Sequence, residues 1–337
     1  MHALDAPWPA AIAVSGGGDS VALMWLAREW AKKKKLKLPH ILTVDHGLRA
    51  ESKRDAAFVV KAAKALKLKA SVLSWKGAKP KSDIEAAARD ARYRLMGAWC
   101  RRHKVRALYV AHTLDEQAET FLLRLARGSG LDGLSSMRAV APFPLPEFAD
   151  LKLVRPLLGF TRAELRSLLE QHGLGWREDP MNADSRFARA RLRTIWPALE
   201  NAGLSAGRIA SAAAHLSRAR EALEAATNDL LARASRTQDD VLLLDAKALT
   251  TAPREIGLRA LAHALNQTSG QLYRPRFEKL ESLFDALTQS GPVPARTLHG
   301  CRIGRAPKRL AVFGGETILV EKERAKRRMI AVGAQIS

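Results

Sequence analysis

Short apolar runs alternate with amphipathic stretches along roughly the first third of the chain. Runs with the length and composition of buried strands lie at residues 11–14, 40–44, 70–75 and 107–111. Stretches with apolar positions at helical spacing separate them, at residues 21–35, 55–66 and 82–103. Repeated strand–helix units predict an α/β fold with a doubly wound, mostly parallel sheet. Because ligands of such folds bind beyond the carboxyl ends of the strands, we examined the segments that begin at Ser15, Asp45 and His112 for chemistry.

The pattern changes in the second half of the chain. A short extended stretch at residues 154–157 precedes a helix from Thr161 to His172, which a Thr161-x-x-Glu164 capping box opens. Residues 201–207 have the composition of a linker. Beyond it we expect a long helix, a strand, two further helices and a hairpin that crosses Ala306-Pro307, at residues 209–234, 241–244, 254–265, 275–288 and 297–313. The expected domains are therefore residues 1–206, a smaller α+β domain at 207–321 and a basic tail at 322–337.

Composition adds a preference for polyanions. The 337 residues include 56 Lys and Arg against 34 Asp and Glu, a formal net charge of +22, and 47% are hydrophobic, which excludes global disorder. Such an excess favours nucleic acid as a partner, although it could also serve solubility alone. The apolar runs are shorter than a membrane span and the first residues lack a signal-peptide layout, so we expect a cytoplasmic protein without membrane contact. Two cysteines, Cys100 and Cys301, exclude a disulfide framework and a four-cysteine zinc site.

The first candidate site is the hexapeptide Ser15-Gly16-Gly17-Gly18-Asp19-Ser20. It lies between a predicted strand and a predicted helix, where backbone amides and the helix N-terminus can surround an anion. It lacks the Gly-Lys-Ser/Thr of a Walker loop and the spacing of a dinucleotide-binding fingerprint. A tight glycine turn is the alternative, and anion binding is the interpretation that the flanking serines and Asp19 favour.

The second candidate site is the segment from His112 to Thr120. His112, Glu116 and Glu119 follow at i, i+4 and i+7, so a helix would bring them to one face. Carboxylates there could hold Mg²⁺ against phosphates, because Mg²⁺ prefers oxygen ligands. Thr113 and Glu116 also have the spacing of a capping box, so Glu116 could simply close the helix. The residues alone favour neither interpretation.

Three further segments are open to two interpretations each. Asp45-His46-Gly47 could be an ordinary turn or part of the site. Arg89 and Arg92 fit a solvated helix face slightly better than a substrate contact. A series of arginines follows a turn-rich loop and favours phosphate contact over a solvated face: Arg186, Arg189, Arg191 and Arg193.

These blocks resemble known families. The glycine loop resembles the S-G-G-x-D-S signature of the PP-loop, or N-type, ATP pyrophosphatases, which cleave ATP between its α and β phosphates. The block from Ala111 to Thr120 resembles the A-H-x-x-D-D-Q-A-E-T block of tRNA(Ile)-lysidine synthetases. Further matches to that family are V-D-H-G-L-R at 44–49, E-x-x-A-R-x-x-R-Y at 85–93, R-P-L-L at 155–158 and W-x-x-D-x-x-N at 176–182 with its arginine series. The chain departs from the pattern at Glu116, where the family has Asp, and at Ala190, where it has Asn.

The resemblance implies a PP-loop catalytic domain, of the adenine nucleotide alpha hydrolase-like fold, at residues 1–206 and a tRNA-binding domain at 207–321. It implies an ATP-dependent ligase that joins L-lysine to the wobble cytidine of tRNA(Ile) through an adenylated cytidine. ATP would lie at Ser15, Gly16, Gly17, Gly18, Asp19, Ser20, Asp45, His46 and His112, and Asp19 and Glu116 would hold Mg²⁺. The implied substrate contacts are Asp115, Glu119, Arg186 and Arg193, and the implied catalytic residues are Asp19, Glu116 and Arg189.

Two other functions stay open on the sequence. A PP-loop tRNA thiolase that makes 2-thiocytidine would share the fold, but its iron–sulfur cluster needs cysteines arranged together, and Cys100 and Cys301 are isolated. A basic tRNA-binding protein without catalysis would bind tRNA and consume no ATP.

Overall fold

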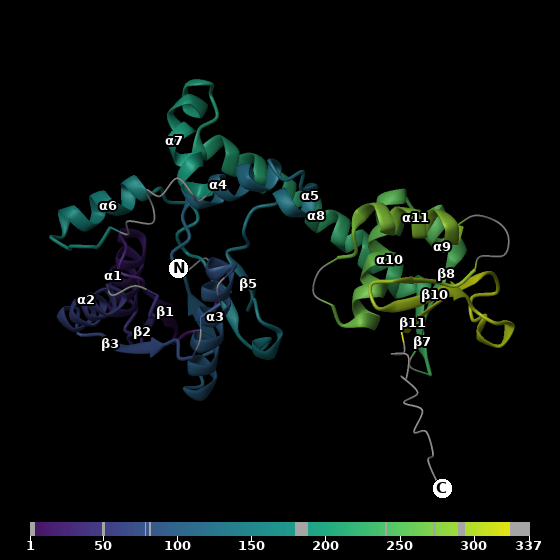
Figure 1. Cartoon of the computed structure of the whole chain (residues 1–337), viewed down its shortest axis with the longest axis horizontal. Helices are drawn as coiled ribbons and strands as arrows, with labels where there is room; N and C mark the ends of the chain where they lie inside the picture. Colours follow the sequence, from purple (N-terminus) through teal and green to yellow (C-terminus); the bar gives the residue numbers. More distant parts are fainter. Residues whose placement is uncertain are drawn as a thin grey trace, which may run out of the picture. The chain divides into compact units, whose positions relative to one another are not determined.

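The chain forms two compact units, Met1–Ser217 and Arg218–Ser337, in a computed structural model (Figure 1). The structure describes residues 4–48, 51–77, 79–80, 82–178, 188–239, 241–271, 274–288 and 294–323. No helix among these residues is long and apolar enough to cross a lipid bilayer.

The first unit is built on a six-stranded sheet of order β3-β2-β1-β4-β6-β5, in which only the edge strand β5 runs antiparallel to its neighbour. The doubly wound, mostly parallel α/β fold predicted from the sequence is therefore confirmed. Its first seven elements are β1 (Ala11–Ala13), α1 (Gly18–Lys33), β2 (His40–Asp45), α2 (Ser52–Ala65), β3 (Lys69–Ser74), α3 (Ile84–Arg102) and β4 (Ala107–Tyr109). The sheet is completed by β5 (Val140–Pro142), a short 3₁₀ helix η1 (Pro146–Phe148) and β6 (Lys152–Val154).

Both faces of this sheet are buried. Ile12, Ile41 and Tyr109 pack with α1 and α2, whereas Ala11, Leu42 and Leu108 pack with α3 on the opposite face. Successive strand residues point to opposite faces, so burial of both faces requires continuous apolar runs, which is the pattern seen in the sequence. The chain reverses its direction of travel across the sheet at β1, which lies between β2 and β4. The carboxyl ends of β1 and β4 therefore form the switch point at which such sheets bind ligands.

Four further helices belong to the first unit: α4 (Leu114–Leu125), α5 (Leu131–Leu134), α6 (Arg162–Gln171) and α7 (Ala188–Asn201). The long helix α8 (Ala206–Ala234) begins in the first unit and continues into the second. Capping boxes open both α4 and α6, through Thr113 with Glu116 and Thr161 with Glu164. The predicted linker at 201–207 is shorter than expected, because α7 continues to Asn201 and α8 begins at Ala206. Gly203, with φ of 84°, makes the turn between them.

The second unit contains a five-stranded antiparallel sheet of order β7-β8-β11-β10-β9. Its strands are β7 (Ser235–Gln238), β8 (Val241–Asp245), β9 (Arg296–Leu298), β10 (Cys301–Arg305) and β11 (Thr317–Lys322). Helices α9 (Ala246–Thr251), α10 (Arg254–Ser269) and α11 (Phe277–Thr288) share a core with it, and η3 (Lys308–Leu310) lies between β10 and β11. The predicted α+β architecture of this region is confirmed.

The hairpin predicted at residues 297–313 has its turn at a different position from the one expected at Ala306-Pro307. The chain reverses at His299-Gly300, where φ values of 58° and 72° suit a two-residue turn between antiparallel strands. Ala306 still donates a hydrogen bond to the carbonyl of Thr317 (2.8 Å), but Pro307 has no N–H and ends the ladder between β10 and β11.

Candidate active site

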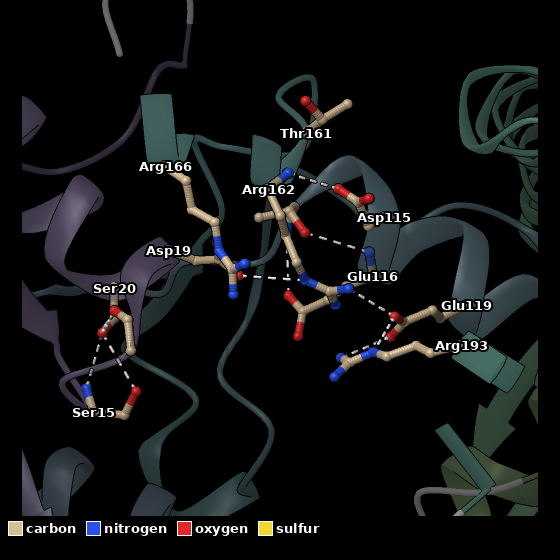
Figure 2. Close-up of polar contacts among 12 residues, drawn as sticks. Ser15, Asp19, Ser20, Asp115, Glu116, Glu119, Thr161, Arg162, Arg166 and Arg193 are labelled. Carbon is tan, nitrogen blue, oxygen red and sulfur yellow. Dashed lines mark hydrogen bonds and ion pairs between the residues drawn. The ribbon is translucent and has the colours of Figure 1, made fainter. Parts of the chain in front are cut away.

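The glycine loop joins β1 to α1 and closes on itself. The Ser15 N–H donates to Ser20 Oγ (3.2 Å) (Figure 2). The Ser20 hydroxyl donates to the carbonyl of Gly17 (2.8 Å). Gly16 has φ of 99°, a left-handed conformation that other residues rarely adopt, and a Cβ there would lie 3.5 Å from Phe58. The N-cap of α1 is Gly17, so the first-turn amides of a 16-residue helix face the loop without a capping side chain. The loop therefore has the form of an anion-binding site.

A cavity of about 510 Å³ opens beside this loop, at the carboxyl edge of the sheet. Its walls come from the ends of β1, β2 and β4 and from α2, α3, α4, α6 and α7. Of the residues named from the sequence, it is lined by Ser15, Gly17, Gly18, Asp19, Ser20, His46, Arg89, Arg92, His112, Glu116, Arg189 and Arg193. Most of the candidate residues thus converge on one place.

Three further candidates, Gly16, Asp45 and Asp115, do not line the cavity themselves but hydrogen-bond to residues that do. Gly16 accepts a hydrogen bond from the Arg177 N–H (3.0 Å), and Asp115 Oδ2 accepts one from the Arg162 N–H (2.8 Å). Asp45 Oδ1 accepts from the Gly47 N–H (2.9 Å) and from the Ser52 hydroxyl (2.5 Å), which together lower the pKa of Asp45. Asp45 therefore makes a local turn, while its neighbour His46 lines the cavity. Arg186 lies outside the described residues.

Glu119 is the most buried acid near the site, with 1% of its side chain exposed. Its Oε1 accepts hydrogen bonds from Arg162 Nη1 and from Arg193 Nε, both at 2.8 Å (Figure 2). Burial by itself would raise the pKa of Glu119, but the hydrogen bonds from Arg162 and Arg193 outweigh it and lower that pKa. Glu119 is thus ionised and connects α6 to α7 through these two arginines. Arg162 and Arg193 line the cavity, whereas Glu119 does not.

Four acids line the cavity, of which Asp55 pairs with Arg177 and Glu178 pairs with Arg166. The other two are Asp19 and Glu116. Burial raises the pKa of each, although Arg162 acts in the opposite direction on both. Arg162 Nε lies 3.6 Å from Asp19 Oδ2. Glu116 Oε2 also accepts from the Thr113 N–H (3.2 Å), so this residue closes the first turn of α4 and faces the cavity as well. The two interpretations that the sequence left open are both compatible with its position.

Arg89 and Arg92, which the sequence placed slightly in favour of a solvated helix face, lie in the cavity wall. Arg89 is exposed, yet both side chains line the cavity, because α3 packs on the sheet beside β4 with this face toward the switch point. Their guanidinium groups lie 5.0 and 5.3 Å from the ring centre of Tyr93. Two neighbouring arginines over one aromatic ring add positive charge to this wall.

Sequence reasoning missed two arginines of α6 that line the cavity, Arg162 and Arg166. They lie at i and i+4, and Arg162 directly follows Thr161, the N-cap of the capping box that the sequence did reveal, so their common face could have been predicted from that helix start. Trp176, which the sequence identified only as the start of a matched segment, lies beside the glycine loop, with its ring 3.5 Å from the position that a Cβ of Gly18 would take. The arginines in the cavity wall are Arg89, Arg92, Arg162, Arg166, Arg177, Arg189 and Arg193, which suits a polyanionic ligand.

Residues 7–199 match the family of PP-loop domains. The chain is 39% identical to a tRNA(Ile)-lysidine synthase of Wolbachia pipientis wMel over 333 residues, which cover 97% of this chain and 73% of that protein. It is 40% identical to a tRNA(Ile)-lysidine synthase of Bradyrhizobium diazoefficiens, over 89% of this chain and 88% of that protein. Among solved structures, the U34-tRNA thiolase NcsA from Methanococcus maripaludis with its [4Fe-4S] cluster is similar in fold, with a TM-score of 0.50 at 18% identity over 62% of this chain and 72% of that chain.

Proposed function

The chain belongs to the PP-loop family, and within it to the tRNA(Ile)-lysidine synthases, and we infer that it is the enzyme that uses ATP to join L-lysine to the wobble cytidine of tRNA(Ile). The observation that carries this inference is the convergence of the anion-binding glycine loop, two desolvated acids and a wall of arginines on one cavity. Such a cavity suits a triphosphate and a second anionic substrate better than a small neutral ligand.

The reaction that we propose has two steps, adenylation of the cytidine and displacement of AMP by lysine. The C2 carbonyl oxygen of the cytidine attacks the α-phosphorus of ATP, and pyrophosphate leaves as the P–O bond to the β-phosphate breaks. The ε-amine of lysine, once it has lost a proton, then attacks C2 and displaces AMP. The first step is needed because a carbonyl oxygen is a poor leaving group, whereas its adenylate is a good one. Because the target base lies in an anticodon loop, it can enter the cavity without breaking duplex pairs.

We assign the roles of the cavity residues as follows. The loop from Ser15 to Ser20 binds the phosphates of ATP through its amides and hydroxyls, with His46 and His112 beside them. Arg189, a planar and always charged donor in the cavity wall, stabilises the charge that develops at the adenylated base. Asp115 and Glu119 orient Arg162, through its N–H and its guanidinium respectively.

The acids of the cavity fit Mg²⁺. Asp19 and Glu116 both line it and offer carboxylate oxygens, while no group of three or more metal-ligating side chains occurs among the described residues. This matches the usual preference of Mg²⁺ for one or two carboxylates together with substrate phosphates. When bound, the ion would neutralise phosphate charge.

Nucleoside analysis tests this function directly. The protein is incubated with labelled L-lysine, ATP, Mg²⁺ and unfractionated tRNA, and the tRNA is then digested to nucleosides. We expect a lysine-modified cytidine, together with AMP and pyrophosphate in amounts equal to it. AMP release without labelled cytidine would contradict the proposed acceptor, and the absence of both products would contradict the function.

The thiolase alternative has only a likeness in fold to support it. Cys100 and Cys301 are both buried, and they belong to different units of the chain. Burial raises the pKa of the Cys100 thiol to about 12, which keeps it protonated and unreactive. Neither cysteine lines the cavity, so sulfur chemistry has no donor there.

Three variants of Glu116 separate its two possible roles. Glu116→Gln keeps a side chain that can complete the capping box with Thr113 but removes the charge. If the carboxylate acts on substrate or metal, Glu116→Gln should lower kcat on the order of 100-fold with little change in thermal midpoint, whereas Glu116→Asp should retain substantial activity. AMP release and thermal unfolding measure the two effects. Full activity of Glu116→Gln, with loss of stability in Glu116→Ala, would leave only the capping role.

Binding of tRNA should weaken steeply with salt. We assign tRNA binding to residues 207–321 in addition to the cavity arginines, and each phosphate contact releases counterions. If the protein makes about six phosphate contacts, the dissociation constant should rise on the order of 1000-fold between 50 and 200 mM salt. Filter binding at several salt concentrations measures the slope. A dissociation constant that does not change with salt concentration would contradict an interface in which arginine and lysine side chains contact phosphates.

A further inference from the structure

Arg155 and His112 meet at the carboxyl edge of the sheet for a topological reason. Strands β4 and β6 are parallel neighbours with Tyr109 opposite Val154, so the residues that follow both strands leave the sheet on the same edge. Arg155 follows β6 directly and precedes Pro156, which favours an extended backbone at Arg155. His112 lies three residues beyond β4 and lines the cavity.

The contact between the two side chains fixes which nitrogen of the ring is protonated. Arg155 Nε donates a hydrogen bond to His112 Nδ1 at 3.0 Å. A guanidinium has only N–H donors, so Nδ1 must present its lone pair. The proton of a neutral imidazole then lies on Nε2, the nitrogen left for a ligand.

Arg155 itself is held at both ends. Its N–H donates to the carbonyl of Ala139 (2.8 Å), and its Nη1 donates to the carbonyl of Arg138 (2.8 Å). With the backbone and one side-chain nitrogen anchored, Nε has a fixed direction toward His112. Such an arrangement sets the orientation and the tautomer of a functional histidine, as neighbouring groups do for metal-bound and catalytic imidazoles.

The surroundings of His112 keep the ring neutral. Burial lowers the pKa of His112 to about 3, helped by Arg155, by Arg89 and Arg92 of α3 and by Arg189 of α7. The ring therefore adds no charge to the cavity at physiological pH. It offers a neutral N–H donor in a wall that also holds seven arginines.

We propose that Arg155 is a positioning residue that holds His112 in the tautomer protonated at Nε2, so that the ring donates a hydrogen bond from Nε2 to a phosphate oxygen of the bound nucleotide. This inference rests on the proposed function for the identity of the acceptor, but the tautomer does not depend on it. In this arrangement His112 is neither a general base nor a metal ligand, because both roles need a free lone pair on Nε2.

Nitrogen NMR of the full chain tests the tautomer without any assay of activity. The protein has 9 histidines, and the signals of His112 are identified by their loss in His112→Gln. We expect Nδ1 of His112 at the shift of an unprotonated nitrogen and Nε2 at that of a protonated one, unchanged from pH 8 to pH 5.5. In Arg155→Met both signals should move toward a mixture of tautomers and titrate at a higher pH. Arg94→Gln is the matched control, since Arg94 is an exposed residue of α3 that pairs with Asp90 and Glu147.

Two outcomes of this experiment would overturn the proposal. A proton on Nδ1 in the wild type would contradict the assigned tautomer. Unchanged His112 signals in Arg155→Met would show that Arg155 does not set it. If Arg155→Met fails to fold, the substitutions of His112 itself decide.

Amides placed at either ring nitrogen test the hydrogen bond. The amide nitrogen of Gln can reach the position of Nε2, whereas that of Asn reaches the position of Nδ1. AMP formation should fall less than about 10-fold in His112→Gln and on the order of 100-fold in His112→Asn. Equal losses in the two variants would contradict donation from Nε2. If the wild type forms neither AMP nor lysine-modified cytidine, the proposed function fails while the NMR result still decides the tautomer.

Discussion

Replacing Asp19 by alanine should abolish adenylate formation. Asp19 belongs to the glycine loop, lines the cavity and lies 3.6 Å from Arg162. Its carboxylate could hold Mg²⁺ together with that of Glu116, whereas the other two cavity-lining acids, Asp55 and Glu178, are paired with Arg177 and Arg166. We expect pyrophosphate release in the presence of tRNA to fall on the order of 1000-fold in Asp19→Ala, and nearly as far in the isosteric Asp19→Asn.

The isosteric substitution Asp19→Asn should not destabilise the folded protein. Burial raises the pKa of Asp19 above its unfolded value, so the folded protein binds the proton more tightly than the unfolded chain. Stability is then lost as pH rises from the unfolded to the folded pKa, and at neutral pH the ionised carboxylate is a net cost. Asp19→Asn removes that cost, so its thermal midpoint at pH 7 should equal or exceed that of the wild type. A site held at the expense of stability is typical of functional groups.

Asp150→Ala is the control for this pair, because Asp150 is an exposed acid that pairs only weakly with Arg101 across 3.2 Å at the surface. It should change neither rate nor midpoint. Full pyrophosphate release by Asp19→Asn would remove Asp19 from the mechanism. A large fall in its thermal midpoint would instead assign Asp19 a structural role.

The parts of the fold that local chemistry decides could be predicted from the sequence. The apolar runs that became β1, β2 and β4 are buried on both faces, which makes them recognisable without knowing their neighbours. The capping box of α6 involves Thr161 and Glu164, residues three apart, and was likewise recognised. The hairpin in the second unit was misplaced because Ala306-Pro307 is a strong turn signal, whereas the observed turn at His299-Gly300 is a weaker one.

Many members of the candidate site could be predicted from the sequence, but Arg162 and Arg166 were missed, and the partners of the buried residues could not be predicted. The glycine loop and the acids of α4 carry recognisable spacing. Glu119, however, is paired with Arg162 and Arg193, which lie 43 and 74 residues further along the chain. His112 is paired with Arg155, 43 residues away. No periodicity relates such positions, since they meet only because α6, α7 and β6 return to the same edge of the sheet.

This difference divides the acids of the site into two chemical kinds. Asp19 and Glu116 line the cavity, and burial raises the pKa of each, so their charge is held at a cost that a bound cation would relieve. Glu119 lies behind the wall and is already neutralised by two guanidinium groups, which lower its pKa. Environments that push the pKa values of neighbouring acids apart are typical of sites in which each acid has its own role. We therefore place Asp19 and Glu116 with substrate and metal, and Glu119 with the orientation of the arginines.

Replacing Glu119 by alanine should strongly destabilise the first unit. The carboxylate is 1% exposed and accepts from Arg162 Nη1, Arg193 Nε and, at 3.4 Å, Arg193 Nη2. Removing it leaves two partly buried guanidinium groups without their shared counterion, which typically costs about 3–5 kcal/mol. Glu147→Ala is the matched control, because Glu147 is 39% exposed in its pair with Arg94 and should cost about 1 kcal/mol or less.

Urea unfolding, followed by a probe confined to the first unit such as its tryptophans, measures the effect. Because the pKa of Glu119 is lowered, its contribution is present above the unfolded pKa of a glutamate and is lost as pH falls toward the folded value. The difference in unfolding free energy between wild type and Glu119→Gln should therefore shrink on acidification below about pH 4.3. A Glu119→Ala variant as stable as Glu147→Ala, or a difference from Glu119→Gln that does not depend on pH, would show that the bridge between α6 and α7 does not hold the cavity wall together. In that case the arginines of the site would have to be oriented by the ligand itself.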